Sequence, residues 1–313
     1  MKWLLAAFAV FVLVSTSHCA DDSVVWCYHL DSCNYTRWPT IAPNFCNRSR
    51  QSPINIVTAD ATVDASLTDF TFTNYDSTTA MTIIENTGRT VKVLLADGVK
   101  VSGGGLNETY DALQFHLHWG NGTMSPGSEH TVNGKRYPME LHIVHVRESF
   151  NKNTTLAVAN GTGLAALGFF IEGTSGNSTG LPEAWKNLTE LLSQIQTQGK
   201  NASILAGFSL NDILVGVNRS NYWRYLGSLT TPNCNEAVVW TVFKETIKVS
   251  RDIINLFGTT VLIGNSTSEK MIDVFRGIQP AQAVTTTGSG TSSASKACYS
   301  LGLMALGLAL GRH

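Results

Sequence analysis

Neither sign of charge is in excess in this chain. It has 22 Lys and Arg against 23 Asp and Glu, a formal net charge of −1 at pH 7 over 313 residues. Nucleic-acid binding needs clustered positive charge, so the composition gives no electrostatic reason to expect DNA or RNA as a partner. The sequence also has no Gly-rich phosphate loop and no His-Glu-x-x-His string. These absences exclude a P-loop nucleotide site and the helical zinc site of metalloproteases.

An apolar run long enough to cross a membrane is missing at the N-terminus. Residues 1–20 begin Met1-Lys2-Trp3, continue as an apolar block to Val14 and then turn to small residues. A spanning helix needs about 20 apolar residues, whereas a basic start followed by a short apolar block is typical of a secretory signal peptide. We therefore predict that residues 1–20 are a signal peptide that the mature protein lacks.

The C-terminal apolar run is also short. The composition changes to Thr, Gly, Ser and Ala over 285–295 and becomes apolar over 297–311. A helix of that tail would be about 22 Å long, less than the roughly 30 Å hydrocarbon core. Residues 285–313 therefore predict a linker and a glycosylphosphatidylinositol (GPI) attachment signal, with Ser289 preferred as the attachment residue. Such a protein would be anchored at the extracellular face of the plasma membrane. The alternative is a short membrane-spanning tail.

Cysteine is infrequent, with six residues in the chain. Cys19 lies in the signal cleavage zone and Cys298 in the tail that would be removed, which leaves four: Cys27, Cys33, Cys46 and Cys234. An even number in a secreted chain predicts two disulfides, with three possible connectivities. The spacing favours a local bridge between the first two and a long-range bridge between the others. Cysteine-ligated zinc is the alternative.

Asn-x-Ser/Thr glycosylation sequons are frequent, which fits a secreted protein and indicates surface loops. They begin at Asn34, Asn47, Asn107, Asn121, Asn153, Asn160, Asn177, Asn187, Asn201, Asn218 and Asn265.

Histidines concentrate in one part of the chain. Of the eight, five lie between residues 116 and 145. His116 and His118 are two apart in a strand-like run, so both point to the same face, and His142 lies in a second such run. Three histidines leave one tetrahedral position of a zinc ion open, which is the pattern of a catalytic site. The alternative is that these histidines are ordinary buried core residues.

Residues that could orient these imidazoles accompany them. Gln114 and Glu140 each precede a candidate ligand by two residues, on its own face of the strand. The second ring nitrogen of a zinc-bound histidine is usually anchored by such a group. Glu129 lies between the two ligand strands and would need a hydrogen-bond partner if buried.

The sequence predicts one mainly β domain over residues 21–284, without internal repeat or linker. A helix is predicted from Pro182 to about Gln196, because leucines recur at helical spacing after a proline start and Gly199 closes it. Alternation and β-branched residues predict the strands 70–72, 81–85, 90–95, 113–119, 141–146, 164–171, 237–243 and 259–263.

Several motifs together resemble the α-class carbonic anhydrases across nearly the whole mature chain. They are Gln51-Ser52-Pro53-Ile54-Asn55-Ile56, Gln-Phe-His-x-His-Trp-Gly over 114–120, Ser128-Glu129-His130-Thr131-Val132, Glu140-Leu141-His142 and Gly227-Ser228-Leu229-Thr230-Thr231-Pro232. The extra cysteines, Trp26-Cys27-Tyr28 and the anchor-like tail are most similar to the GPI-anchored, type-four-like branch.

The resemblance implies a large, twisted, mostly antiparallel sheet with short peripheral helices. It implies Zn²⁺ on the three histidines, whose bound hydroxide attacks carbon dioxide to give bicarbonate, with sulfonamides as inhibitors. Thr230 would orient the hydroxide while donating a hydrogen bond to Glu129, and Thr231 would line the water path. The branch also carries the two disulfides that spacing favours. Carbon dioxide would lie against an apolar wall of Val144, Ala166, Leu229, Val238 and Trp240.

The chain departs from the family pattern at three positions. Arg89 replaces the proton-shuttle histidine of the fast members, and arginine does not titrate near neutral pH. We therefore expect proton release to depend on external buffer, or on His29. Ala166 stands where many members have valine, which should widen the pocket slightly. Lys92 replaces a common asparagine and should add a charge to the mouth, altering inhibitor preference.

Two other functions compete with carbon dioxide hydration. Some carbonic-anhydrase-like domains serve as surface binding or adhesion modules with little turnover, although those normally lack a ligand histidine. Ester hydrolysis would use the same hydroxide as a weak side activity.

Overall fold

The computed structural model describes residues 24–123, 125–174, 182–205 and 207–288. The predicted signal peptide, the candidate attachment residue Ser289, the apolar tail and the sequon at Asn177 lie outside the described residues. Within the described part of the chain, no helix is both long and apolar enough to cross a membrane.

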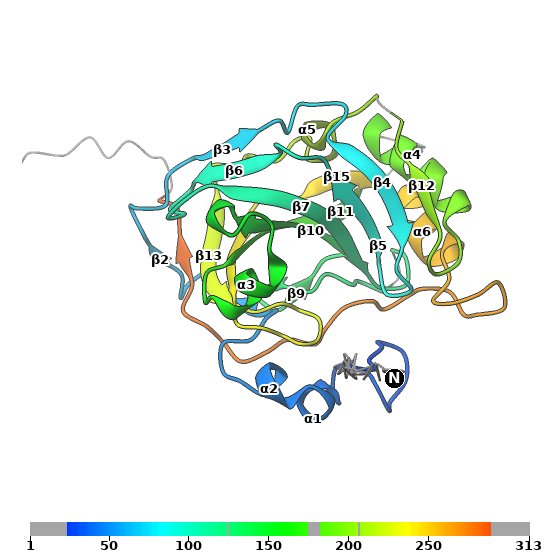
Figure 1. Ribbon diagram of the computed structural model, residues 1–313, viewed down its shortest axis with the longest axis horizontal. Coiled ribbons are helices and arrows are strands. Elements are labelled where there is room, and N and C mark those ends of the chain that lie inside the picture. The colour runs from blue at the N-terminus through cyan, green and yellow to red at the C-terminus, as the bar shows by residue number, and fades with distance from the viewer. Residues whose placement is uncertain (1–23, 124, 175–181, 206, 289–313) are drawn as a thin grey trace, which may run out of the picture.

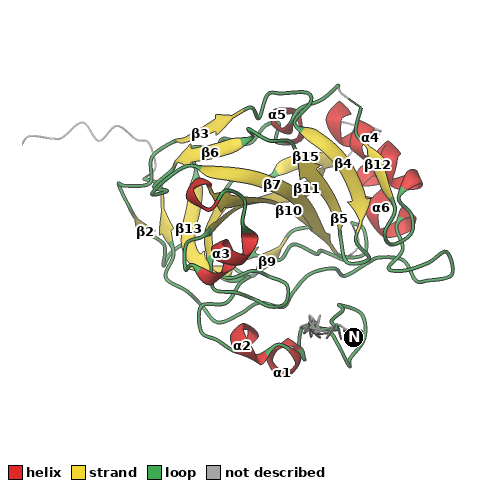
Figure 2. Ribbon diagram, in the orientation of Figure 1, coloured by secondary structure: helices red, strands yellow, loops and turns green. Residues whose placement is uncertain are grey.

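One large sheet forms the body of the molecule, with short helices around it (Figures 1 and 2). Most of its neighbouring strands are antiparallel, and β11 with β14 is the main parallel pair. This confirms the predicted fold class. In spatial order its main path is β12 (Asn201–Ser203), β4 (Met81–Asn86), β5 (Val91–Leu95), β7 (Tyr110–Trp119), β10 (Met139–Arg147), β11 (Leu164–Thr174), β14 (Val238–Phe243), β13 (Tyr222–Gly227), β16 (Thr285–Thr286) and β2 (Thr62–Val63).

Shorter strands complete the sheet and add a small second one. β15 (Ile247–Ser250) pairs with β11, and β6 (Lys100–Gly103) joins β7 to β3 (Phe70–Thr73). The small sheet contains β1 (Asn55–Ile56), β8 (Thr131–Val132) and β9 (Lys135–Arg136).

The helices lie outside the sheet, as Figure 2 shows. The predicted helix is present as α4 (Glu183–Glu190), continued by the 3₁₀ turn η2 (Leu191–Gln194). Its Trp185, Leu188 and Leu192 are buried at helical spacing, which is the pattern that predicted it. The others are α1 (Trp38–Ile41), α2 (Pro43–Cys46), η1 (Glu148–Phe150), α3 (Thr154–Ala159), α5 (Leu210–Ile213) and α6 (Arg251–Thr260).

The strand predicted over 259–263 is wrong. Helix α6 extends to Thr260, and Leu262 makes only an isolated bridge with Lys270. Ile253, Ile254 and Phe257 recur at helical spacing and are buried in the core. The burial of these three side chains favours the helix. It outweighs the β propensity of residues 259–263, because β propensity mainly reflects how well a side chain fits a packed surface.

The two faces of β10 meet different surroundings. Leu141 and Ile143 point into the larger hydrophobic cluster, with Phe115 and Leu117 of β7. On the other face, Val146 belongs to a second cluster that includes Trp240 of β14. Alternation along β10 therefore places His142 and Val144 on the second face.

The folded part continues past the predicted boundary at residue 284. β16 pairs with β13 and with β2, and Thr286 and Thr287 are buried. Residues 285–286 therefore belong to the sheet and not to a linker. Composition misplaced this boundary because threonine is common both in linkers and in strands.

Two disulfides tie the N-terminal segment. Cys27 pairs with Cys33, six residues along, and Cys46 pairs with Cys234 across a sequence separation of 188. This is the pairing that spacing favoured. Trp38 is fully buried beside Cys46 and Cys234 in a small cluster of its own.

Candidate metal centre and its surroundings

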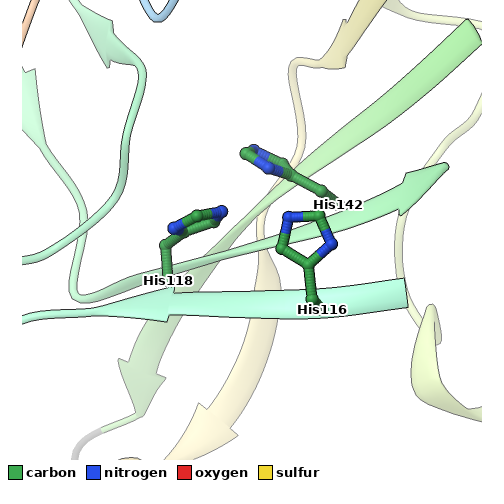
Figure 3. A group of neighbouring side chains, drawn as sticks. All are labelled: His116, His118 and His142. Atoms are coloured by element: carbon green, nitrogen blue, oxygen red, sulfur yellow. The ribbon is translucent and has the colours of Figure 1, made fainter. Parts of the chain in front are cut away.

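Antiparallel pairing of β7 and β10 brings three imidazoles together. His142 lies opposite His116, and Glu140 lies opposite His118. Figure 3 shows the three rings converging from these two strands, with ring centroids 5.0, 5.3 and 4.6 Å apart. One nitrogen from each ring lies within 4.8 Å of the others.

Each ring is held by a hydrogen bond at its outer nitrogen. His116 Nδ1 is 3.0 Å from Gln114 Oε1, and His142 Nε2 is 2.8 Å from Glu140 Oε1. His118 Nδ1 donates to the carbonyl of Val274 at 2.9 Å. Gln114 and Glu140 thus make the contacts that the sequence predicted, whereas no local pattern pointed to Val274. The anchors leave Nε2 of His116, Nε2 of His118 and Nδ1 of His142 directed inward.

Three buried atoms at the centre lack hydrogen-bond partners. They are His118 Nε2, His142 Nδ1 and Glu129 Oε2. The carboxylate oxygen is 3.4 Å from the first nitrogen and 3.8 Å from the second. Unpaired buried polar atoms cost free energy, so this arrangement needs a cation that accepts nitrogen lone pairs. Three imidazoles at this spacing fit Zn²⁺ with one position open.

Burial keeps His116 and His118 ready to bind a cation. It lowers the pKa of His116 well below its ordinary value, assisted by His118, His142 and Lys92. It lowers the pKa of His118 as well, against the opposing charge of Glu129. Neutral imidazoles with free lone pairs are the form that binds metal.

Glu140 is the hub of a buried network. Its Oε1 also lies 2.7 Å from His130 Nδ1, and its Oε2 accepts the His130 amide at 2.8 Å. Burial opposes ionisation of Glu140, but His130 and His142 hold its pKa well below the ordinary range. Gly168 leaves room for this carboxylate, because a Cβ there would come within 3.1 Å of Oε1.

A cavity of about 130 Å³ lies over two of the ligand histidines, His116 and His142. Leu164 belongs to its lining although the sequence analysis missed it; its place two residues before Ala166, on the same strand face, was the available signal. Every predicted wall residue is present, together with both threonines. The full lining is Gln114, His116, His142, Val144, Leu164, Ala166, Leu229, Thr230, Thr231, Val238 and Trp240.

Glu129 is fully buried, and its hydrogen bond comes from a backbone amide that the sequence analysis did not predict. Its Oε1 accepts the backbone amide of Arg276 at 2.8 Å. Among the described residues no hydrogen bond joins Thr230 to Glu129, which differs from the contact that the resemblance implied. The unpartnered Oε2 faces the ligand histidines instead.

Gln51 and Ser52 connect Glu129 to the threonine loop. The Arg276 guanidinium donates to Gln51 Oε1 at 2.9 Å and to the Ser52 carbonyl at 2.7 Å. Gln51 in turn donates to the carbonyl of Cys234 at 3.2 Å, and the Ser52 amide donates to Ser228 Oγ at 3.0 Å. Burial lowers the pKa of Arg276 to about 10. The sequence showed Gln51 and Ser52 as a motif, but gave no sign of these partners.

Arg89 and His29 line a different cavity, next to the N-terminal segment. Neither residue belongs to the lining of the cavity over the histidines. Lys92 lies opposite His116 in the sheet and pairs with Glu85 at 2.5 Å. The charge that Lys92 was expected to bring to the mouth is therefore partly offset.

Comparison with known proteins agrees with this geometry. A family model described as eukaryotic-type carbonic anhydrase matches residues 33–287. The chain is 39% identical to carbonic anhydrase 4 of Oryctolagus cuniculus over 87% of this chain and 86% of that protein. It is 34% identical to carbonic anhydrase 12 of Homo sapiens, over 85% and 74% of the two chains. Similarity to relatives named carbonic anhydrase 4 confirms the expected branch. The chain therefore belongs to the eukaryotic-type carbonic anhydrase family and to its enzyme class, the zinc-dependent carbonate dehydratases.

Proposed function

We propose that this protein catalyses the reversible hydration of carbon dioxide to bicarbonate and a proton. One observation carries the proposal: three anchored imidazoles turn their free nitrogens toward one another beneath a mainly apolar cavity. His116, His118 and His142 would hold Zn²⁺. When bound, zinc lowers the pKa of a coordinated water to near neutrality, a general property of this enzyme class.

The remaining residues would position the reactants. Carbon dioxide carries no charge, and the apolar side chains of Val144, Leu229 and Trp240 suit it. Thr230, in the lining of the cavity, would orient the attacking oxygen. Thr231, in the same lining, would border the water path.

Ala166 and Lys92 would tune this site. The small side chain of Ala166 on the cavity wall should widen the pocket slightly. The Lys92 ammonium, already paired with Glu85, would act on charged inhibitors more than on turnover. Sulfonamides should bind at the metal, and weak ester hydrolysis should accompany the main reaction.

The protein would act outside the cell. We infer a signal peptide over residues 1–20 and a GPI anchor attached near Ser289, which would place the enzyme on the extracellular face of the plasma membrane. The two disulfides support an oxidising compartment. Exposed sequons such as Asn47, Asn121 and Asn201 are accessible to glycan.

A surface binding module with little turnover is the second candidate. Arg89 is the observation that favours this candidate. It stands in place of the proton-shuttle histidine, and its side chain still makes a hydrogen bond within the fold.

Carbon dioxide hydration by purified, zinc-loaded protein in a stopped-flow instrument tests the proposal. We expect turnover that a sulfonamide abolishes and that rises with buffer concentration. Protein that holds one zinc ion and shows no turnover at high buffer would contradict the enzyme and leave the binding module.

We expect Arg89→His to raise turnover at low buffer by roughly tenfold or more, since a positioned group that titrates near neutral pH can carry protons. The measurement is turnover at limiting buffer against turnover at saturating buffer, where the variant and the parent should agree. Arg48→His is the matched control, because Arg48 also stacks on an aromatic ring yet does not line either cavity. An unchanged buffer dependence in Arg89→His would show that position 89 does not limit proton release.

A further inference from the structure

The cavity beside the N-terminal segment contains a cation without an acidic partner. It measures about 130 Å³, and its lining includes Trp26, Tyr28, His29, Arg89 and Gln198. Arginine remains protonated at neutral pH, even though burial lowers the pKa of Arg89 here. Within the part of the chain that the structure describes, no ion pair joins Arg89 to a carboxylate. The cavity therefore has a fixed positive charge.

One edge of the Arg89 guanidinium is fixed, and the other is available. Nε and Nη2 donate to the carbonyl of Trp26 at 3.2 and 3.0 Å, and the guanidinium carbon lies 4.2 Å from the centre of the Trp26 ring. Nη1 has no hydrogen-bond partner among the described residues. The side chain is thus held in place with part of its planar donor fork unused. Such a fork matches the geometry of a small oxyanion.

The same cavity lies next to the candidate metal centre. Val274 lines it, and the carbonyl of Val274 anchors His118. Tyr28 also lines it, and the charges of both Glu129 and Arg89 act on the Tyr28 phenol. An ion in the cavity is therefore separated from His118 by Val274.

From these contacts we infer that the cavity beside Arg89 binds a small oxyanion, phosphate or bicarbonate, and that bound phosphate accepts the proton of the hydration reaction in place of a side chain. The inference rests on the proposed function. Hydration of one carbon dioxide releases one proton, and hydrogen phosphate takes it up to become dihydrogen phosphate. Bound bicarbonate does not serve this role, because taking up the proton would give carbonic acid, which loses water to regenerate carbon dioxide. No other bond forms or breaks in the transfer.

Kinetics in two buffers of matched pKa test the role of the charge. Phosphate is an anion in its proton-accepting form, whereas imidazole is neutral. We expect Arg89→Gln to raise the half-saturating phosphate concentration by roughly fivefold or more, the effect of one exposed charge pair at contact distance. The half-saturating imidazole concentration should stay unchanged. Arg48→Gln should behave as the parent in both buffers. An equal response of parent and Arg89→Gln to phosphate would overturn the inference.

Binding is measured separately, with a sulfonamide saturating the metal position so that anions cannot bind there. We expect the ³¹P resonance of phosphate to broaden with the parent protein and with Arg48→Gln, but not with Arg89→Gln. A parallel titration with ¹³C-bicarbonate identifies which oxyanion binds more tightly. Absence of broadening in both titrations would overturn the site. Zinc-loaded protein without turnover in either buffer would overturn the proposed function and the proton-accepting role together, while the resonance measurement would still decide whether the anion binds.

Discussion

Replacing His118 by alanine will leave a folded protein that has lost both its zinc and its activity. The imidazole is buried, its Nδ1 is anchored by Val274, and its Nε2 has no partner in the structure. Two remaining histidines hold zinc poorly, so the bound metal should fall from about one ion per chain to nearly none. Loss of the metal removes several kcal/mol of charge stabilisation, which predicts a fall in turnover of roughly 10³-fold or more. Elemental analysis and stopped-flow kinetics measure the two effects.

The control for this experiment is His145→Gln. His145 lies on β10 three residues after His142, is equally buried, and contacts the Tyr75 hydroxyl at 2.8 Å. Burial lowers the pKa of His145 to about 4, so the ring is neutral and structural. The variant should lose stability yet keep its zinc. Zinc retained by His118→Ala, or lost by His145→Gln, would mean that the metal is held by other residues.

Removing the bridge between Cys46 and Cys234 should produce the largest change in stability. The bridge spans a sequence separation of 188, and the chain-entropy estimate for a loop of that length is about 5 kcal/mol. We expect Cys46→Ser combined with Cys234→Ser to lower the free energy of unfolding by that amount, measured as a shift in the urea midpoint. Activity should fall as well, since Cys234 lies four residues after Thr230 and its carbonyl bonds Gln51.

The other disulfide provides the matched comparison. Cys27 and Cys33 are six residues apart, and the same estimate gives about 2 kcal/mol for a loop of that size. Serine at both of these positions should therefore destabilise the protein by less than half as much. Equal losses for the two double variants would show that strain or packing, and not loop entropy, sets the contribution of each bridge.

Local patterns predicted the centre of the site well. The spacing of His116 and His118 fixes both rings on one face whatever the rest of the chain does, and the anchors Gln114 and Glu140 follow from the same alternation. The same reasoning explains how the strands around residues 115 and 142 could be predicted, because each is a long run of alternating or apolar residues. Helix α6 was missed although Ile253, Ile254 and Phe257 show helical spacing.

What the sequence could not predict depends on contacts between distant segments. The carbonyl of Val274 and the amide of Arg276 are backbone groups, which leave no trace in residue type, yet they position His118 and Glu129. Unpaired Arg89 is visible in the sequence only as a departure from a pattern. Its stacking on Trp26 needs the N-terminal segment to lie against the turn between β4 and β5, and no periodicity encodes that path.

The bond between Gln51 and Arg276 joins residues 225 positions apart. A ribosome therefore makes all three ligand histidines long before it makes the residue whose amide holds Glu129. Until the last part of the domain emerges, the nascent chain has its three imidazoles but no fixed carboxylate beside them. Gln51 likewise lacks its hydrogen bond to Arg276 until then. The reaction centre is thus completed only near the end of translation. A truncated chain that ends before Arg276 would have the three ligand histidines to bind metal but would lack the contact that positions Glu129 for catalysis.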